Sequence, residues 1–440
     1  MSPFPREMSL RKTRVLKVLA ASAALALSMA ACGGGGGGDS SAALTAKGPI
    51  TIWYSNNEQE VAWGKAMVAK WNAANPDQTV TGQEIPAGTS SEEVIGAAIT
   101  AGTAPCLVLN TAPSAVGQFQ RQGGLVNLNT FPDGQSYVES RSGDVAQQYK
   151  SADGGYYQLP WKSNPVMIFY NKDILKKAGL DPANPKLSTY ADFLATSKTL
   201  VSSKSAKYAI NPAASSEFYQ PQFDFMQLYA AETGGKGLIT DGQATFNDAS
   251  GVEVANFWKS MYANGLSGKE KLQGDPFADK RAAMAIVGPW AVAVYKGKVD
   301  WGVVPVPTSK GITADETWSF SDAKNIGLYT ACKNQGTAWE VLKFATSEAE
   351  DSALLTTTGQ MPLRKDVATT YADYFSKNPA YKLFGSQASR TVEVPAGPHT
   401  VEMLQDLRDA YTKAVITGEG DVPTALNDAA AKVTKLAGEN

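Results

Sequence analysis

The hydrophobic positions of this chain follow two spacings that alternate along most of its length. Short, nearly continuous apolar runs, such as Ile50–Tyr54 and residues 106–110, are typical of buried strands. Between these runs lie stretches with a large apolar residue at every third or fourth position. The stretch Glu58–Ala74 has this spacing and predicts a helix with one face in the core, which the following Asn75-Pro76 pair ends.

The same alternation continues to the C-terminus. It predicts helices at 92–101, 189–202, around 254–261, at 337–346 and at 401–417, and a strand at 283–287. Strands that alternate with helices over 440 residues predict an α/β fold with mainly parallel sheets, and the length exceeds what one core usually serves. We therefore expect two lobes, with a ligand beyond the strand ends and between the lobes.

The N-terminal segment predicts export. Basic residues precede the apolar stretch 18–31, which is shorter than the roughly 20 residues of a membrane-spanning helix. Cys32 follows directly, and residues 27–32 resemble a bacterial lipobox, although Met29 replaces the usual Leu, Val or Ile. We expect residues 1–31 to be a lipoprotein signal peptide, Cys32 to carry the lipid, and residues 32–48 to form a flexible Gly/Ser-rich tether. The alternative is an ordinary secretory signal with an incidental cysteine.

The composition argues against several classes of binding and catalytic site. The formal charge of −2 gives no basic excess that would attract nucleic acid. Beyond Cys32 the only cysteines are Cys106 and Cys332, and His399 is the only histidine, which is too few for a Cys/His zinc site. No Gly-x-Ser-x-Gly turn is present. A carboxylate pair for glycoside hydrolysis stays compatible with the sequence, because the fold sets its spacing. We expect no metal or cofactor.

Several segments resemble a known family. They are Tyr-Tyr-Gln-Leu-Pro-Trp at 156–161, residues 169–180, Pro185 with 188–193, the strand ending in Gly-Pro-Trp at 277–290, and residues 338–344 and 359–364. Together, in this order, they resemble the extracellular solute-binding proteins of sugar ABC importers, the maltose-binding-protein-like family. The resemblance covers residues 49–440.

This resemblance implies a two-lobe, type II periplasmic-binding-protein-like α/β fold with a hinge and a ligand in the interlobe cleft. One lobe would hold residues 49–158 with 323–360, and the other 159–320 with 363–440. The implied function is high-affinity binding of a sugar or oligosaccharide and its delivery to ABC transporter permease subunits, without bond chemistry. The protein would be a monomer, lipid-anchored on the outer face of the cytoplasmic membrane or periplasmic, and not an enzyme.

The resemblance also implies which positions contact the sugar, because aromatic rings cover its apolar faces and polar groups pair with its hydroxyls. The implied contacts are Asn57, Glu58, Asn110, Ser114, Trp161, Asn164, Glu217, Phe218, Tyr219, Trp290, Asp322, Asn325 and Arg364.

Other roles are open for some of these positions. Trp290 is the predicted stacking platform, and its alternative is a core tryptophan. Asn57 and Glu58 could instead cap a helix, and Arg364 could form a salt bridge near the hinge.

Two further questions stay open at this stage. In the family, residues 326–331 return antiparallel to the strand that Cys106 begins, so a disulfide between Cys106 and Cys332 is expected in an oxidising exterior, with two buried thiols as the alternative. The alternative functions are a surface-anchored glycoside hydrolase and the same fold binding a non-sugar solute such as a glycerol phosphodiester. The hydrolase needs two carboxylates across the cleft, and the anion receptor needs clustered Arg or Lys.

Overall fold

The computed structural model of the chain describes residues 40–55, 57–87, 91–212, 223–270, 272–394 and 397–439. The predicted signal peptide, Cys32, and most of the predicted tether lie outside these residues. The described elements belong to the unit Ser41–Asn440, apart from the first residue of the first helix. No helix within the described ranges is long and apolar enough to cross a membrane.

The first sheet contains five strands in the order β2-β1-β3-β12-β4. Parallel pairing joins β1 to β2 and β3, whereas β12 runs antiparallel to both β3 and β4. The expectation of mainly parallel sheets is therefore wrong: the strand that returns from the other sheet enters this one in the opposite direction. The strands are β1 Ile50–Tyr54, β2 Val80–Glu84, β3 Leu107–Thr111, β4 Leu159–Lys162 and β12 Lys324–Leu328.

The second sheet has four strands in the order β10-β5-β9-β6, and it is also mixed. Only β6 and β9 pair in parallel, while β5 runs antiparallel to β9 and β10. Two short ribbons join β7 to β8 and β11 to β13. These strands are β5 Met167–Asn171, β6 Tyr208–Ile210, β7 Ile239–Thr240, β8 Gln243–Ala244, β9 Ala282–Val287, β10 Trp301–Val304, β11 Ser319–Phe320 and β13 Thr391–Val392.

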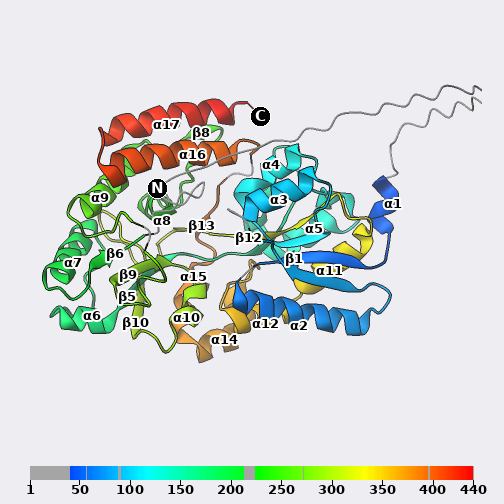
Figure 1. Cartoon of the computed structure of the whole chain (residues 1–440), viewed down its shortest axis with the longest axis horizontal. Helices are drawn as coiled ribbons and strands as arrows, with labels where there is room; N and C mark the ends of the chain where they lie inside the picture. The colour runs from blue at the N-terminus through cyan, green and yellow to red at the C-terminus, as the bar shows by residue number, and fades with distance from the viewer. Residues whose placement is uncertain are drawn as a thin grey trace, which may run out of the picture. The chain divides into compact units, whose positions relative to one another are not determined.

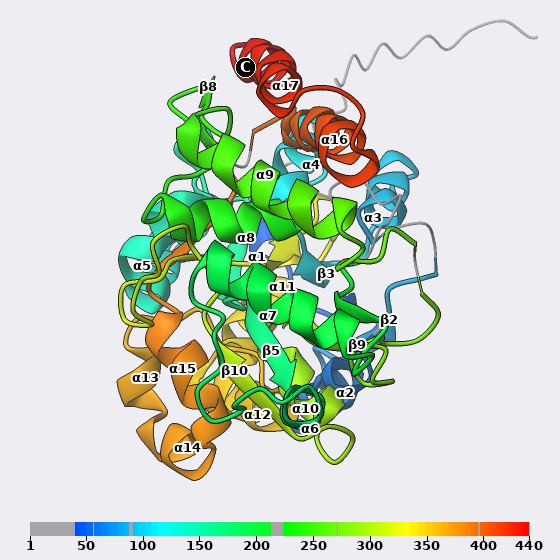
Figure 2. The same ribbon diagram turned by 90° about the vertical axis from the view of Figure 1, so that its left-hand side faces the viewer.

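Helices cover both sheets (Figure 1). The helices of the first half are α1 Ser40–Thr45, α2 Glu58–Ala74, α3 Ser91–Thr100, η1 Pro113–Ala115, α4 Val116–Arg121, η2 Leu128–Thr130, α5 Gly134–Ser142, η3 Gly143–Tyr149, α6 Lys172–Lys177 and α7 Tyr190–Ser202. Those of the second half are α8 Phe223–Glu232, α9 Ala249–Ala263, α10 Trp290–Tyr295, α11 Gln335–Ala345, α12 Glu348–Thr358, α13 Val367–Thr370, α14 Ala372–Lys377, α15 Pro379–Gln387, α16 Thr400–Tyr411, the π-helix η4 Thr412–Thr417 and α17 Val422–Ala437. Figure 2 looks onto α7, α8 and α9, which share a core with the second sheet.

Each sheet is apolar on both faces, which explains the continuous apolar runs in the sequence. In β1, Ile52 and Tyr54 belong to the core on one face, while Trp53 belongs to the core on the other. In β5, Ile168 packs with the helices α7–α9, and Phe169 packs on the opposite face beside α15. Successive strand residues point to opposite faces, so both faces need an apolar covering layer.

The predicted helices form where the sequence contains both a cap and an apolar stripe. Helix α2 has the predicted bounds, because Asn57 accepts hydrogen bonds from the N–H groups of Gln59 and Glu60 at 3.1 Å. The hydroxyl of Thr189 caps α7 in the same way by accepting from Asp192 N–H at 3.0 Å. The apolar stripe of α2 is buried in the core of the first sheet.

Two predicted boundaries need correction. Strand β4 belongs to the first sheet, so the crossing to the second sheet follows Lys162 and not residue 158. The predicted tether extended to residue 48, yet Ser40–Thr45 is a helix whose Leu44 packs against the first core. Hydrophobic burial of Leu44 explains this helix within a segment that composition alone marks as a linker.

The connections between the two sheets lie side by side and are hydrogen bonded to one another. Ser163 donates its N–H to Met361 O at 3.0 Å, and Asn164 donates to Ser321 O at 2.7 Å. The hydroxyls of Ser163 and Ser321 also lie 2.8 Å apart. The three crossing segments therefore form one small ladder, which is the place where a hinge between lobes would act.

The structure contains the disulfide expected from the sequence. Cys106 and Cys332 are bonded, across 226 residues of sequence. Cys106 immediately precedes β3, and the antiparallel partner strand β12 ends a few residues before Cys332. The bond therefore fixes the end of this strand pair inside the first lobe.

Candidate functional site

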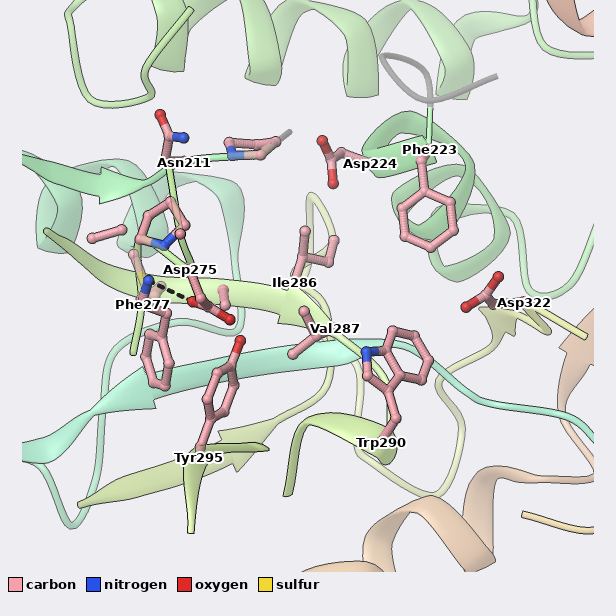
Figure 3. Close-up of a pocket in the computed structure, with 16 residues that line it drawn as sticks. Asn211, Phe223, Asp224, Asp275, Phe277, Ile286, Val287, Trp290, Tyr295 and Asp322 are labelled. Atoms are coloured by element: carbon pink, nitrogen blue, oxygen red, sulfur yellow. Dashed lines mark hydrogen bonds between the residues drawn. The ribbon is translucent and has the colours of Figure 1, made fainter. Parts of the chain in front are cut away.

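A cavity of about 420 Å³ opens beside the second sheet, within the 300–1,000 Å³ typical of small-molecule sites. Its floor is β9, and its walls come from the start of α8, the start of α10, the loop at 274–277 and the crossing segment at Asp322 (Figure 3). The lining residues are Asn211, Pro212, Phe223, Asp224, Gly274, Asp275, Pro276, Phe277, Ala282, Met284, Ala285, Ile286, Val287, Trp290, Tyr295 and Asp322.

Trp290 presents an aromatic face to this cavity. It is the first residue of α10, directly after Gly288-Pro289, and its indole lies across the end of β9. A Cβ at Gly288 would fall 1.9 Å from the indole ring, so only glycine leaves room for this orientation. Trp290 is half-buried, which leaves part of the ring accessible to a ligand.

Further aromatic side chains extend this wall. Phe223 lies across from Trp290, and the Phe277 and Tyr295 rings lie 4.7 Å apart at the other end of the cavity. Tyr295 is buried and is hydrogen bonded to Asp275. Such rings offer apolar faces with polar groups at their edges, as the C–H faces and hydroxyl rim of a pyranose require.

Three carboxylates line the cavity. Asp275 accepts hydrogen bonds from Phe277 and Ala278 N–H, both at 2.9 Å. Asp322 has a positive φ of 40°, and burial raises its pKa against the opposing effect of the Lys324 ammonium 3.7 Å away. Asp224 is only 4% exposed, and burial raises its pKa to about 8.

A second, much smaller pocket of about 20 Å³ lies on the other side of Asp322. Ser114 and Lys324 from the first lobe line it together with Glu393, whose pKa burial raises to about 8. Glu393 accepts from its neighbour Val394 N–H at 2.9 Å. Asp322 therefore stands between the larger cavity and the contact of the two lobes.

The family model of the bacterial extracellular solute-binding proteins matches residues 29–383. The chain belongs to this family.

Related members of the solute-binding family are similar over most of the chain. The maltodextrin-binding protein MdxE of Bacillus subtilis is 26% identical over 344 residues, which cover 75% of this chain and 76% of that protein. A maltooligosaccharide ABC transporter solute-binding lipoprotein of Streptococcus pneumoniae is 23% identical over 63% of this chain and 65% of its own length. The solved cyclic alpha-maltosyl-1,6-maltose binding protein of Arthrobacter globiformis has a TM-score of 0.74 and 20% identity, over 90% of this chain and all of that one. The last similarity establishes the two-lobe binding-protein fold.

The structure brings two of the predicted contacts to the cavity, namely Trp290 and Asp322. Ser114 lines the adjoining small pocket instead. Glu217, Phe218 and Tyr219 lie outside the described residues, so their predicted role stays a prediction.

Other predicted contacts have structural roles in this arrangement. Asn57 is the cap of α2, and Glu58 is exposed away from the cavity beside Lys65 and Glu84. Asn110 is half-buried and does not line the cavity.

Trp161 and Asn325 were predicted to contact the ligand, but both side chains are buried in the first lobe. Trp161 is 1% exposed and packs on Trp63 with ring centroids 5.4 Å apart. Asn325 accepts from Trp161 N–H at 3.1 Å and donates to Gln158 at 2.6 Å. A motif gives the position of a residue along a strand but not the contacts of its side chain in the fold, and neither residue lines the cavity.

Asn164 is also buried, in the crossing segment. Its amide donates to Gln360 at 3.3 Å, and Gln360 in turn donates to Glu60, which forms a 2.7 Å ion pair with buried Lys162. Burial lowers the pKa of Lys162, an effect that Glu60 opposes. Asn164 therefore belongs to a polar network at the hinge and does not line the cavity.

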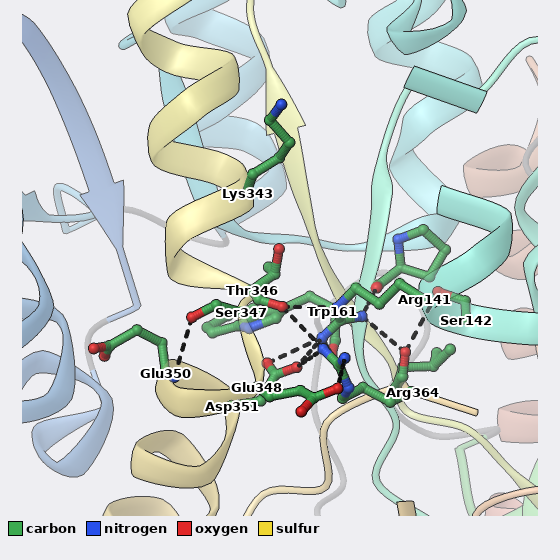
Figure 4. A network of polar contacts seen from close by, with 12 residues as sticks. Arg141, Ser142, Trp161, Lys343, Thr346, Ser347, Glu348, Glu350, Asp351 and Arg364 are labelled. Carbon is green, nitrogen blue, oxygen red and sulfur yellow. Dashed lines mark hydrogen bonds and ion pairs between the residues drawn. The ribbon is translucent and has the colours of Figure 1, made fainter. Parts of the chain in front are cut away.

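Arg364 lies in a second buried network (Figure 4). It contacts Asp351 at 3.0 Å and Glu348 at 3.1 Å, while Arg141 contacts Asp351 at 2.8 Å. Arg141 also donates to the carbonyls of Pro160, Leu363, Trp161 and Thr346. Arg364 therefore forms salt bridges near the hinge, as the alternative prediction for this residue had it.

Sequence reasoning missed the cavity residues Asp224, Phe223, Asp275 and Tyr295. One signal was available: Asp224 is an acid among the apolar residues that begin α8, a position at which a carboxylate needs a reason. The other three gave no comparable signal.

Proposed function

We propose that this protein binds a sugar or oligosaccharide in the cavity beside Trp290 and delivers it to the permease of an ABC importer, without breaking bonds in it. The single observation that carries the proposal is the pairing of an accessible indole with three carboxylates in one cavity of about 420 Å³. The sugar-binding relatives of the family support it.

The chemistry of the lining fits a pyranose. Its C–H face would stack on Trp290, and Phe223 would cover the opposite side. Sugar hydroxyls would hydrogen bond to the carboxyl groups of Asp322 and Asp224, whose oxygens can accept from them. A buried hydroxyl without such a partner costs about 1–3 kcal/mol, so these contacts would set specificity.

The lining disfavours an anionic solute. No Lys or Arg is among the described residues that line the cavity. The three basic residues nearest to the predicted contacts are each in an ion pair: Lys162 with Glu60, Lys324 with Asp322 and Arg364 with Asp351. A glycerol phosphodiester would need uncompensated Arg or Lys instead.

The location of the protein is part of the same proposal. We propose that residues 1–31 direct export, that Cys32 carries the lipid, and that the mature protein acts as a monomer on the outer face of the cytoplasmic membrane. A stable anchor would need more than one acyl chain. The lipoprotein relative of Streptococcus pneumoniae supports this location.

A thermal-shift screen tests the proposed function. The full chain, produced with Cys32→Ser, is heated with mono-, di- and oligosaccharides and with glycerol phosphates. A sugar at 100 times its Kd should add about 2.7 kcal/mol, which is a shift of about 3 °C for a protein of this size. Trp290→Ala should abolish the shift, while Trp301→Ala, which removes a packing indole outside the cavity, should lower the melting temperature but keep the ligand shift.

The outcomes separate the candidate functions. A sugar that shifts the melting temperature and is recovered intact supports the transport receptor. Turnover of that sugar would instead show a glycoside hydrolase. A shift caused only by glycerol phosphates would show an anion receptor and refute the proposal.

A further inference from the structure

The cavity is strongly acidic in its described lining, and its three carboxylates are not compensated equally. Asp275 is satisfied by two backbone N–H groups, and Asp322 has Lys324 at 3.7 Å. Asp224 has no hydrogen bond or ion pair with any described residue, although only 4% of its surface is exposed. One carboxylate therefore lies buried at the cavity without a hydrogen-bond or ion-pair partner among the residues that the structure describes.

The side chain of Asp224 points into the cavity, above Ile286 and toward the space in front of Trp290 (Figure 3). The phenols of Tyr262 and Tyr411 are close enough to interact electrostatically with Asp224, and they offer no positive charge. Burial of an ionised carboxylate without a partner is costly, and the raised pKa of Asp224, about 8, reflects this. A buried carboxylate of this kind lowers the stability of the fold. Because Asp224 also faces the cavity, a bound ligand could contact it and offset that cost.

A sugar hydroxyl would give Asp224 a hydrogen bond but no positive charge. An ammonium group would give a hydrogen bond in which both partners are charged, and it would also supply a positive charge next to the carboxylate. The aromatic faces of Trp290 and Phe223 attract cations in addition. Within the described ranges no three His, Cys, Asp or Glu side chains could hold a metal ion, and the cavity has the size of an organic ligand.

We propose that the preferred ligand is an amino sugar, with its protonated amine bound by Asp224 and its ring stacked on Trp290. This inference rests on the proposed function and specifies the class of sugar. Neutral sugars would bind in the same cavity, more weakly, because they bring no positive charge to stabilise the ionised form of Asp224.

Matched pairs of sugars test the inference by titration calorimetry with the full chain carrying Cys32→Ser. The pairs are glucosamine with glucose, galactosamine with galactose, mannosamine with mannose, and the fully deacetylated chitosan disaccharide with cellobiose. Each monosaccharide pair differs only by one ammonium group in place of a hydroxyl, and the disaccharide pair differs by two such groups. We expect at least one amino sugar to bind about tenfold or more tightly than its neutral partner.

Two variants locate the effect. Asp224→Asn keeps the size of the side chain but removes its negative charge, so it should reduce the affinity ratio between each amino sugar and its neutral partner to about one. Asp173→Asn changes the net charge equally at an exposed position on α6 and should leave the preference unchanged. Thermal melts of both variants verify that they fold.

Every outcome decides a point. An amine preference that Asp224→Asn removes and Asp173→Asn keeps supports the inference. Equal or weaker binding of every amino sugar overturns the inference and leaves the proposed sugar receptor intact. An amine preference that survives in Asp224→Asn overturns the assignment to this residue, and binding by no sugar, neutral or amino, overturns the proposed function as well.

Discussion

The disulfide between Cys106 and Cys332 should be a major source of stability. It closes a loop of 226 residues, for which the chain-entropy model gives about 5 kcal/mol at 25 °C. Removal of a native disulfide usually lowers the free energy of unfolding by about 2–5 kcal/mol. The entropy of unfolding per residue, about 2.1 cal/mol/K, converts this range to a fall of about 2–6 °C in Tm for the described part of the chain.

The assay compares the wild-type protein with the double variant Cys106→Ala, Cys332→Ala, each melted with and without dithiothreitol. The wild type should lose about 2–6 °C on reduction, and the double variant should melt near the reduced wild type and ignore the reductant. This cycle separates the cross-link from the loss of the two side chains, because only the cross-link responds to reduction.

Two results would refute this reasoning. Two free thiols per chain, titrated in the denatured, unreduced protein that lacks Cys32, would mean that the bond is absent. A double variant as stable as the oxidised wild type would mean that the bond contributes nothing to the folding free energy.

Three further predictions follow from the structure. Asp351→Asn leaves the guanidinium groups of Arg141 and Arg364 without their shared carboxylate and should lower the free energy of unfolding, measured by urea denaturation, by about 3–5 kcal/mol. A change below about 1 kcal/mol would contradict the importance of this network. The difference in unfolding free energy between Asp224→Asn and wild type should shift in favour of the variant as pH rises from about 4 to about 8, by up to about 1.4 kcal/mol per pH unit. The reason is that folded wild-type protein keeps a proton on Asp224 that the unfolded chain has lost. A difference in Tm that does not change with pH would contradict this prediction. Gly288→Ala should displace the Trp290 indole and weaken sugar binding by about tenfold or more with little loss of helix content by circular dichroism, whereas unchanged affinity would show that the ring position is not critical.

Local structure followed from the sequence wherever local signals agreed. Helix α2 was predicted with the bounds it has, because Asn57 caps it, its apolar stripe repeats regularly and Asn75-Pro76 ends it. Strand β1 was equally clear. The mixed direction of the sheets was not predictable from these patterns, since an apolar run is the same whether its neighbours run parallel or antiparallel to it.

The site was less predictable, for a physical reason that differs between residues. Trp161 was expected to contact the sugar, yet it packs on Trp63, because the face on which a strand residue lies depends on register rather than on motif. Asp224 was missed because its significance comes from burial at a cavity, which only the packing of α8 against β9 creates. Trp290 lines the cavity, as its place in the family's Gly-Pro-Trp motif implied, and its role as the stacking platform stays a prediction.

The central claim is that an intact sugar occupies the cavity in front of Trp290. The most direct measurement is calorimetric titration of wild-type protein and Trp290→Ala with the sugar identified by the screen, followed by mass spectrometry of the recovered ligand. The account predicts one sugar bound per chain, loss of binding in Trp290→Ala, and a ligand of unchanged mass. Equal affinity in both proteins, or a ligand recovered in cleaved form, would contradict it.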